Sequence, residues 1–568
     1  MRLGVRQDVK SVTACISTIA AVAWRRLARL GRQHVNFVSL HYAYFIVVSL
    51  LASVAFWLLS DPKLSVTYVD SLFMVVSGIT GTGLNVVDLS RLTTAQQVLL
   101  CLLMVGGSAV WVSIWLISAR QASFRRLLKV NGPSRPHLDS GQSRRSPCRG
   151  AHHNALDAAI HACEEKAAGD DDVGQARTEH KALQMLSLVV PLYFTLWQVL
   201  GCLGLGAWIA TNQPGPALEN GINPWWLGIF NGVSAFNNSG MSLLDANMVP
   251  FQAAYYVLLT MGLLILAGNT AYPIFLRFIF WSSLKVVSAL PQGPLVNQWR
   301  STTEYILRHP RRVYTTLFPT QHTWWLLFTI LLLNSIDWAA FELLNLGNPI
   351  VSEISFGPRI MDGLFQAFAV RSGGFYVVPI EKTSIALQVL YVIMMYVSVY
   401  PVVITMRNSN VYEERSLGIF AIESDADQGG RVNSYGAPKS FKTRRMFISQ
   451  QIRGQLANDM WLLALATFII TVIEEPHFTA DPVSFSVFNI IFEIISAYGC
   501  VGISVGSPGA NYSFCGSWRP GSKLVVCLVM LKGRHRMLPA SLDYAVRLPD
   551  NQVPGDGERG GSRTAPAT

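Results

Sequence analysis

The sequence predicts an all-α integral membrane protein in which eight transmembrane helices form four helix–loop–helix repeats with pseudo-fourfold symmetry. Three observations predict this fold: the composition, an alternation of long and short apolar blocks, and a glycine-containing pattern that occurs four times. Of the 568 residues, 51% are hydrophobic and only 14% are charged, whereas soluble domains carry roughly 25% charged residues. This composition excludes an ordinary soluble enzyme and a disordered chain.

The long apolar blocks predict the membrane-spanning helices, because a crossing needs about 20 mostly apolar residues. Five blocks reach this length without an acidic residue, Lys or Arg: His41–Ser60, Val98–Ser118, Ala182–Ala210, Val249–Leu276 and Thr383–Met406. Three weaker blocks complete the set: Thr323–Leu344, which contains two acidic residues, Met460–Ile473, and Leu524–Leu531 between two lysines. Hydropathy alone supports seven crossings and leaves the eighth open.

A short apolar segment lies between the two long blocks of each repeat, and each segment is too short to cross a bilayer. The four segments are Ser71–Ile79, Trp225–Phe236, Ile360–Val370 and Val487–Tyr498. The order is therefore long, short, long, four times over, which predicts four re-entrant segments.

The basic residues predict which side of the membrane each loop occupies. The segments 119–181, 283–322 and 407–456 are rich in Arg and Lys, whereas residues 211–250 contain neither. Basic loops are typically cytoplasmic, so both termini are expected in the cytoplasm and the short segments enter from outside. An even number of crossings follows, which supports the weak eighth block.

These boundaries predict nine segments. The four repeats are 38–118, 182–282, 323–406 and 457–538, the cytoplasmic linkers are 119–181, 283–322 and 407–456, and the cytoplasmic ends are 1–37 and 539–568.

A common pattern follows each short segment. The stretches Thr80–Asp88, Asn237–Asp245, Arg371–Pro379 and Gly499–Ser507 align without gaps, each with glycine at its fourth position. Glycine adopts backbone conformations closed to other residues, and irregular backbone is tolerated at membrane depth where it lines a water-filled path. Four such loops can direct carbonyl oxygens at one axis and replace the hydration shell of a monovalent cation. The alternative, four unrelated external loops, does not explain the common register.

Several further motifs resemble the TRK/HKT/Ktr superfamily of potassium and sodium transporters, and fungal TRK potassium transporters in particular. They are Tyr68–Leu89, Gly268–Pro273, His309–Arg312 with Leu317–Pro319, Asn410–Gly418, and Gly533–Arg536 with Leu538–Pro539. The resemblance covers roughly residues 38–545. It implies potassium uptake across the plasma membrane through a four-loop selectivity filter, driven by the membrane potential, and a homo-oligomer such as the dimers of bacterial members.

The resemblance also implies roles for individual residues. The potassium-binding filter carbonyls would come from Thr82, Gly83, Ser239, Gly240, Gly373, Gly374, Val501 and Gly502. In the plant branch, Ser at the first filter glycine accompanies sodium preference, so Gly83 favours potassium, and Gly83→Ser is expected to shift selectivity toward sodium. The family carries a basic residue below the filter that restrains flow. Arg534 is our match, with Lys532 and Arg536 as competitors, and a cytoplasmic anchor is the alternative role.

Other polar residues near the loops allow two interpretations each. Arg371 is either an outer-mouth charge or a donor that fixes the third loop, and Asp88 and Asp245 either concentrate cations at the mouth or cap the next helix. Glu493 is either a functional group or the buried partner of a nearby group. Asn511 begins a glycosylation sequon in an external loop.

The sequence lacks the phosphate-binding and metalloprotease motifs sought in it. We therefore expect neither an enzyme nor a cofactor. The expected partners are transported potassium, the lipid bilayer and, as the resemblance implies, a second copy of the chain, with no nucleic acid. Two rival functions stay open: sodium or mixed sodium–potassium transport, and a non-transporting membrane sensor on the same scaffold. A carrier of unrelated fold would instead bind its solute in broken helices at the midplane.

Overall fold

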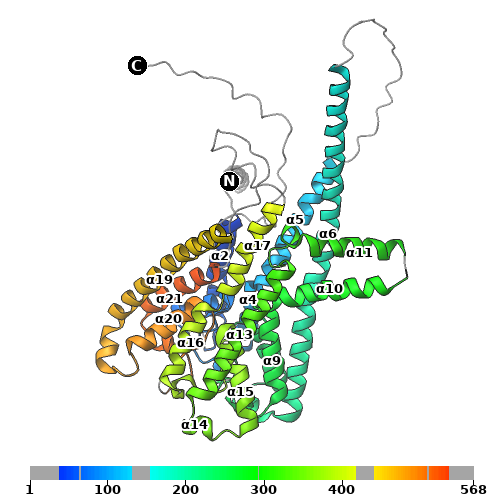
Figure 1. Ribbon diagram of the computed structural model, residues 1–568. Helices are drawn as coiled ribbons and strands as arrows, with labels where there is room; N and C mark the ends of the chain where they lie inside the picture. The colour runs from blue at the N-terminus through cyan, green and yellow to red at the C-terminus, as the bar shows by residue number, and fades with distance from the viewer. Residues whose placement is uncertain are drawn as a thin grey trace, which may run out of the picture.

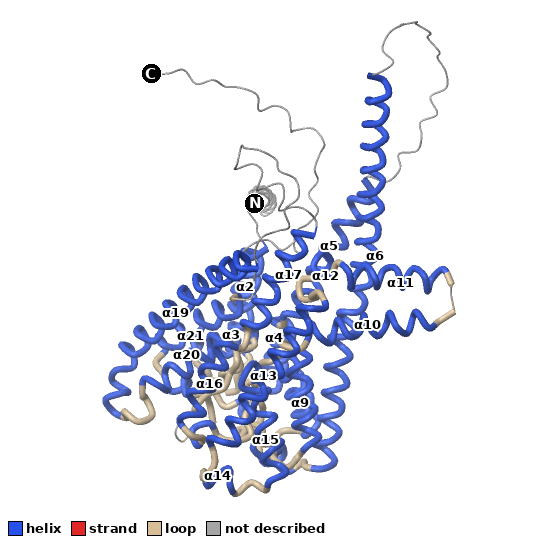
Figure 2. Tube along the Cα trace, viewed as in Figure 1, coloured by secondary structure: helices blue, strands red, loops and turns tan. Residues whose placement is uncertain are grey.

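The computed structural model describes residues 37–62, 65–130, 154–291, 293–416, 441–507, 509 and 511–536. Within these ranges the chain is helical and contains no β-strand. The helices pack into one bundle (Figure 1), and non-helical segments gather in its interior (Figure 2). Apart from Phe37, the expected cytoplasmic ends 1–37 and 539–568 lie outside the described residues.

Each repeat contains a long first helix, a short helix and a final part, which consists of two helices in the first three repeats and of one in the fourth. The first repeat comprises α2 (Phe37–Leu58), α3 (Tyr68–Thr80), α4 (Thr94–Gly107) and α5 (Ala109–Val130). The second comprises α6 (Asn154–Asn212), α8 (Pro224–Phe236), α9 (Tyr255–Gly268) and α10 (Tyr272–Ala289). The third comprises α13 (Thr320–Leu344), α15 (Phe356–Phe368), α16 (Ile385–Val397) and α17 (Tyr400–Ser416), and the fourth comprises α19 (Phe441–Ala480), α20 (Val487–Gly499) and α21 (Pro520–His535).

Short elements connect these helices. They are α7 (Gly215–Glu219), α11 (Pro294–Arg308), α12 (Pro310–Val313), α14 (Pro349–Ser352), the single turns η1 (Leu89–Arg91), η2 (Val249–Phe251), η4 (Ile380–Lys382) and η5 (Phe514–Ser517), and the π-helical turn η3 (Ala369–Gly373).

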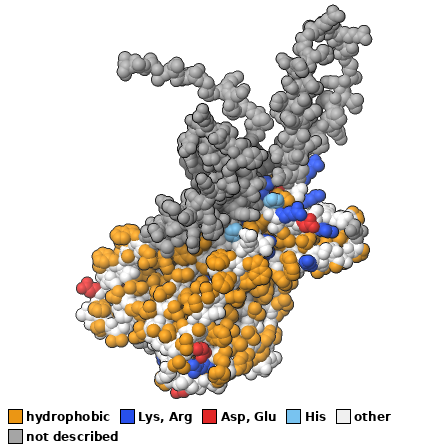
Figure 3. Space-filling view, viewed as in Figure 1, with side chains coloured by type: hydrophobic (Ala, Val, Ile, Leu, Met, Phe, Trp, Pro, Cys, Tyr) orange, Lys and Arg blue, Asp and Glu red, His pale blue; other side chains and the backbone are white. Residues whose placement is uncertain are grey.

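The bundle is built to lie in a membrane. Five described helices are long and apolar enough to cross it, or seven if each of two bent pairs counts as one crossing. Hydrophobic side chains cover the visible face of the bundle body (Figure 3), and exposed apolar area of this extent suits lipid rather than water. The eighth expected crossing corresponds to α21, which has only 16 residues, and the count of eight stays a prediction.

The short helices α3, α8, α15 and α20 are largely buried, and local sequence fixes where they begin. Thr67, Asn223 and Ser486 accept hydrogen bonds at their side-chain oxygens from backbone N–H groups of the first turn, at 2.9–3.3 Å. Such N-caps satisfy donors that have no partner within the helix. Gly81, which ends α3, has a left-handed backbone (φ +66) that favours glycine.

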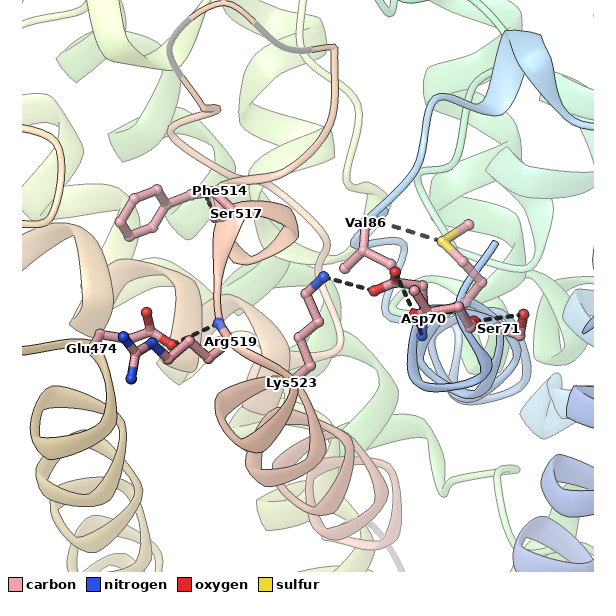
Figure 4. Close-up of polar contacts among 10 residues, drawn as sticks. Asp70, Ser71, Val86, Glu474, Phe514, Ser517, Arg519 and Lys523 are labelled. Carbon is pink, nitrogen blue, oxygen red and sulfur yellow. Dashed lines mark hydrogen bonds and ion pairs between the residues drawn. The ribbon is translucent and has the colours of Figure 1, made fainter. Parts of the chain in front are cut away.

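An ion pair joins the fourth repeat to the first. Lys523 of α21 donates to Asp70 of α3 at 2.6 Å, and both side chains are largely buried. Nearby, Glu474 of α19 accepts from the backbone N–H of Arg519 at 2.8 Å. These contacts hold the start of α21 between the last repeat and the first (Figure 4).

We expect Lys523→Met to destabilise the protein by about 3 kcal/mol, because breaking a buried pair leaves a carboxylate without its counter-charge. The thermal unfolding midpoint in detergent should fall accordingly. Arg91→Met is the control: Arg91 pairs with Asp88 at 3.3 Å, but its side chain is 82% exposed, and exposed pairs contribute about 0–1 kcal/mol. Equal losses in the two variants would contradict the role assigned to Lys523.

Candidate ion pathway

The glycine at the fourth position of each repeated stretch has a left-handed backbone. The φ angles are +86 at Gly83, +82 at Gly240, +73 at Gly374 and +92 at Gly502. Residues with a Cβ rarely adopt this conformation. The common glycine therefore has a conformational cause in all four loops.

These glycines form a closed ring. A Cβ built on each would point at the carbonyl oxygen of the residue that precedes the glycine of the next repeat. The distances are 1.6 Å from Gly83 to Ser239, 2.8 Å from Gly240 to Gly373, 2.2 Å from Gly374 to Val501, and 2.2 Å from Gly502 to Thr82. The contacts run from repeat one through four and back to one. The structure thus brings together all eight residues that the family resemblance assigned to a filter, while their ion-binding role stays a prediction.

Backbone hydrogen bonds orient the four loops. The N–H groups of Thr82, Ser239 and Val501 each donate to the carbonyl five residues earlier, at 2.9–3.1 Å. In the third repeat Gly374 makes the equivalent bond, to Ala369 at 3.0 Å, one position later because of the π-helical turn η3. The loop N–H groups are thereby used at the ends of the short helices, and the neighbouring carbonyls turn toward the next repeat.

Side chains of the short helices also hold the loops. Ser77 donates to the Leu84 carbonyl at 2.7 Å, Ser496 accepts from Gly502 N–H at 3.1 Å, and Gln366 accepts from Val377 N–H at 3.2 Å. Glu493 lies fully buried and accepts from Cys515 N–H at 3.1 Å, which favours its interpretation as a buried structural partner. Hydrogen bonds of this kind hold the loops in a fixed arrangement.

A cavity of about 290 Å³ lies on one side of the ring, lined by Gly83, Gly240 and Gly502 among others. Among the described residues, its lining includes the acidic side chains of Asp245 and Glu381 and contains no Lys or Arg. Asp245 accepts hydrogen bonds from Ser90 at 2.7 Å and from Asn511 at 3.1 Å. A cavity lined by one sign of charge raises the local concentration of counter-ions.

Of three other residues that the sequence predicts on the outer side, one lines this cavity and two do not. Asp88 does not line it and instead contacts Arg91 at 3.3 Å. Asn511 lines it and is exposed, and its glycosylation stays a prediction. Arg371 is only 2% exposed and donates to the Asn334 side chain at 3.4 Å and to the Ser398 carbonyl at 3.3 Å. This geometry favours the donor that fixes the third loop over an outer-mouth charge.

A second cavity of about 150 Å³ lies beyond the C-terminal ends of the short helices. Its lining includes Asn237, Asn238, Gly499 and Cys500, which follow or end these helices. Because the first cavity is lined by the loop glycines and the second by residues that precede them in the chain, the glycine ring lies between the two. The arrangement is a narrow backbone ring with a cavity on each side. After the sidedness predicted from the basic loops, the cavity with Asp245 is here called the outer cavity and the second cavity the inner cavity.

The second long helices of the first two repeats are broken at the inner cavity. The bend is 55° between α4 and α5 and 85° between α9 and α10. A Cβ at Gly107 would lie 1.7 Å from the Ile79 carbonyl, and one at Gly268 would lie 1.6 Å from the Phe236 carbonyl. Glycine therefore lets each second helix touch the end of its short helix.

The fourth repeat has the same contact between glycine and carbonyl, and the third repeat has serine in place of this glycine. A Cβ at Gly533 would lie 2.1 Å from the Tyr498 carbonyl, whereas the third repeat has Ser398 at the corresponding place. Sequence reasoning missed this second pattern. The available signal was a glycine 24, 28 or 31 residues after the ring glycine in three repeats.

The structure separates the three basic residues near the end of α21. Arg534 and Arg536 line the inner cavity, whereas Lys532 is exposed. Arg534 donates to the Gly107 carbonyl, and a Cβ at Gly81 would lie 4.0 Å from its Nη1 atom. Arg536 donates to the Gly499 carbonyl at 3.1 Å and stacks over the Tyr498 ring at 5.1 Å. Arg534 thus lies under the first loop, and Arg536 lies at the end of the fourth short helix.

Known proteins match this chain in sequence. The "Low-affinity potassium transport protein" of Saccharomyces cerevisiae is 36% identical over 396 residues, covering 66% of this chain and 44% of the relative. The "Potassium transporter TRK1" of Candida albicans is 36% identical over 374 residues, covering 66% and 34%. The "Potassium transport protein 2" of Schizosaccharomyces pombe is 37% identical over 381 residues, covering 66% and 42%. The matches span less than half of each relative.

Among solved structures, the potassium transporter TrkH of Vibrio parahaemolyticus matches with a TM-score of 0.47 and 15% identity, covering 88% of this chain and 83% of that one. The model of the TrkH family, described as "Cation transport protein", matches residues 165–554, which is more than half of the chain. The resemblance read from the sequence motifs is thereby confirmed, and the chain belongs to the TrkH family of cation transport proteins.

Proposed function

We propose that this protein takes up potassium across the plasma membrane through the glycine ring. The observation that carries the proposal is the closed contact of the four loops, in which each glycine faces a carbonyl of the next repeat. The family consists of cation transport proteins rather than enzymes, and the three fungal relatives are named as potassium transporters. An inside-negative potential would drive uptake with about 2.3 kcal/mol per charge per 100 mV.

The proposed path suits a dehydrated monovalent cation. Backbone carbonyls replace hydration oxygens, the C-terminal ends of the short helices carry partial negative charge toward the centre, and the outer cavity holds Asp245 and Glu381. Glycine at position 83 supports potassium over sodium by the family pattern. Potassium is cargo here, and the mechanism requires no cofactor.

Orientation and assembly are also part of the proposal. The basic linkers support a cytoplasmic position of both termini, in which the cavity with Asp245 faces outward and the cavity with Arg534 faces inward. The family resemblance supports a homodimer in which each chain has its own path.

Growth on limiting potassium tests the proposal. A host that lacks its own potassium uptake would express this chain or Gly240→Arg, whose side chain would enter the ring. We expect rescue by the first and not by the second at equal membrane expression. Failure of both would favour a sodium transporter or a sensor, and rescue by both would contradict a path through the ring.

We expect Asp245→Asn to raise the KM for potassium about two- to fivefold at low ionic strength with little change in maximal rate. The carboxylate lines the outer cavity, where it concentrates cations before they enter the ring. Uptake of radioactive rubidium as a tracer, at two ionic strengths, measures this effect. Because salt screens such attraction, the difference should shrink at high ionic strength, and a difference independent of salt would contradict an electrostatic role.

A further inference from the structure

Helices α10 and α11 form a hairpin, here called the α10–α11 hairpin (residues 272–308), that projects sideways from the bundle (Figure 1). The bend of 85° between α9 and α10 turns α10 sharply away from the direction of α9. The first helix of the hairpin, α10, ends the second repeat, and α11 (Pro294–Arg308) belongs to the linker 283–322, which is predicted to be cytoplasmic. The position of the hairpin is therefore the boundary between the bilayer and the cytoplasm.

The base of the hairpin is fixed to the bundle. Arg277 of α10 donates to the Phe318 carbonyl at 2.5 Å and to the Thr320 side chain at 2.6 Å, at the start of α13. In α11, Thr303 and Ile306 are buried, and Thr303 contacts Met185 of α6 through its hydroxyl at 3.7 Å. The direction in which the hairpin projects is thus set by the fold.

The projecting part of the hairpin exposes large apolar side chains. Six side chains are 44–72% exposed: Phe278, Trp281, Val286, Leu290, Leu295 and Trp299. Two of them are tryptophans, a residue enriched where membranes meet water because its ring is apolar with one polar edge. This exposure would be costly in water and suits the interfacial layer of a bilayer.

Basic side chains accompany the apolar ones. Lys285, Arg300 and Arg308 are exposed, and Lys285 lies over the Trp281 ring at 6.0 Å. Residues 272–308 contain four basic residues and one acidic residue, Glu304. In the space-filling view, Lys and Arg side chains gather on the upper side of this projection, above hydrophobic ones (Figure 3). In α11, Arg300 and Arg308 lie two turns apart and so share a face, opposite the buried Ile306.

We propose that the α10–α11 hairpin lies in the cytoplasmic headgroup layer and binds anionic phospholipid headgroups through Lys285, Arg300 and Arg308. The positive charge complements an anionic leaflet and opposes the pairing of this face with the same face of a second copy. Such binding would hold α10 in the membrane plane. The break at Gly268 and Asn269, which line the inner cavity, lies immediately before α10.

Lipid retention tests the proposal without reference to transport. The purified full chain would be titrated with phosphatidylserine or phosphatidylcholine, and native mass spectrometry would count the lipids retained. We expect the wild type to retain phosphatidylserine preferentially. The triple variant Lys285→Gln, Arg300→Gln, Arg308→Gln should bind it about tenfold more weakly, since each basic residue near the surface contributes to the attraction.

A second triple variant is the matched control. Arg125→Gln, Arg177→Gln and Lys181→Gln remove the same charge from exposed residues of α5 and α6 outside the hairpin. We expect this variant to retain phosphatidylserine as the wild type does. Equal loss in both triples, or loss in neither, would overturn the proposal. So would a hairpin triple that separates paired chains while its lipid retention is unchanged, because the face would then bind a second copy.

Discussion

We expect Gly83→Ala to abolish potassium uptake while leaving the protein in the membrane. At this position φ is +86, and a Cβ would lie 1.6 Å from the Ser239 carbonyl oxygen. Neither atom can withdraw alone, because the Cβ is fixed directly to the backbone of residue 83, the oxygen is a backbone atom of the ring, and the Ser239 N–H is itself hydrogen-bonded to the Ser234 carbonyl. The loop must therefore shift away from the axis and carry its carbonyls with it. Tracer rubidium uptake at matched surface expression measures the result.

Gly347→Ala is the control that separates the steric clash in Gly83→Ala from the backbone strain of a left-handed alanine. Gly347 has the same φ of +86, but a Cβ there meets nothing within 4 Å. The left-handed conformation alone costs roughly 1–2 kcal/mol, which the fold should tolerate, so we expect nearly normal uptake. Normal uptake by Gly83→Ala would show that ions do not pass the ring.

The repeats could be predicted because their physical cause is local. Each of the four loops follows a short apolar segment and has a glycine at the same place. A glycine at a common place indicates a backbone conformation that only glycine adopts readily. The structure places those four glycines in one ring. The order of loops around that ring and the shift of one residue in the third could not be read in advance. The shift depends on the π-helical turn at Ala369–Gly373, and nothing in the alignment of the four sequences marks this turn.

The broken helices could not be predicted for a different reason. Val98–Ser118 and Val249–Leu276 are continuous apolar blocks. Hydropathy measures how favourably a segment transfers into lipid, and it does not indicate where a helix bends. Gly107 and Gly268 act only through contact with the carbonyls of Ile79 and Phe236, which lie 28 and 32 residues away. A single glycine in an apolar block is common in membrane helices. Its meaning becomes visible when the short helices are in place.

Side-chain direction was the other unpredictable part. Lys532, Arg534 and Arg536 lie within five residues, and a helix points such neighbours in different directions. The rotation of α21 about its own axis leaves Lys532 exposed, whereas Arg534 and Arg536 line the inner cavity. For Arg371, the turn η3 directs the guanidinium toward Asn334 and Ser398. Charge type was readable from the sequence, but the direction of each charge was not.

The second large effect expected is a several-fold rise in uptake in Arg534→Gln. The guanidinium lies in the inner cavity of about 150 Å³, which an ion on the proposed path enters when it leaves the ring. Two like unit charges at about 4 Å repel by about 4 kcal/mol at an effective dielectric constant of about 20. Glutamine keeps a donor for the Gly107 carbonyl but removes the charge. Rubidium uptake per surface-expressed protein, measured at a fixed membrane potential, gives the change.

Two further substitutions show whether a change in the uptake rate of Arg534→Gln is caused by the charge at this position. Lys532→Gln removes the same charge from an exposed position two residues away, so it should leave uptake unaltered. Arg534→Lys keeps the charge and should stay close to the wild type. A rise in both glutamine variants would indicate a general effect of positive charge on the cytoplasmic side. A fall in Arg534→Gln, with expression maintained, would mean that the bond to Gly107 holds α21 against the broken helix α4–α5 and that the charge itself does not restrain the ion.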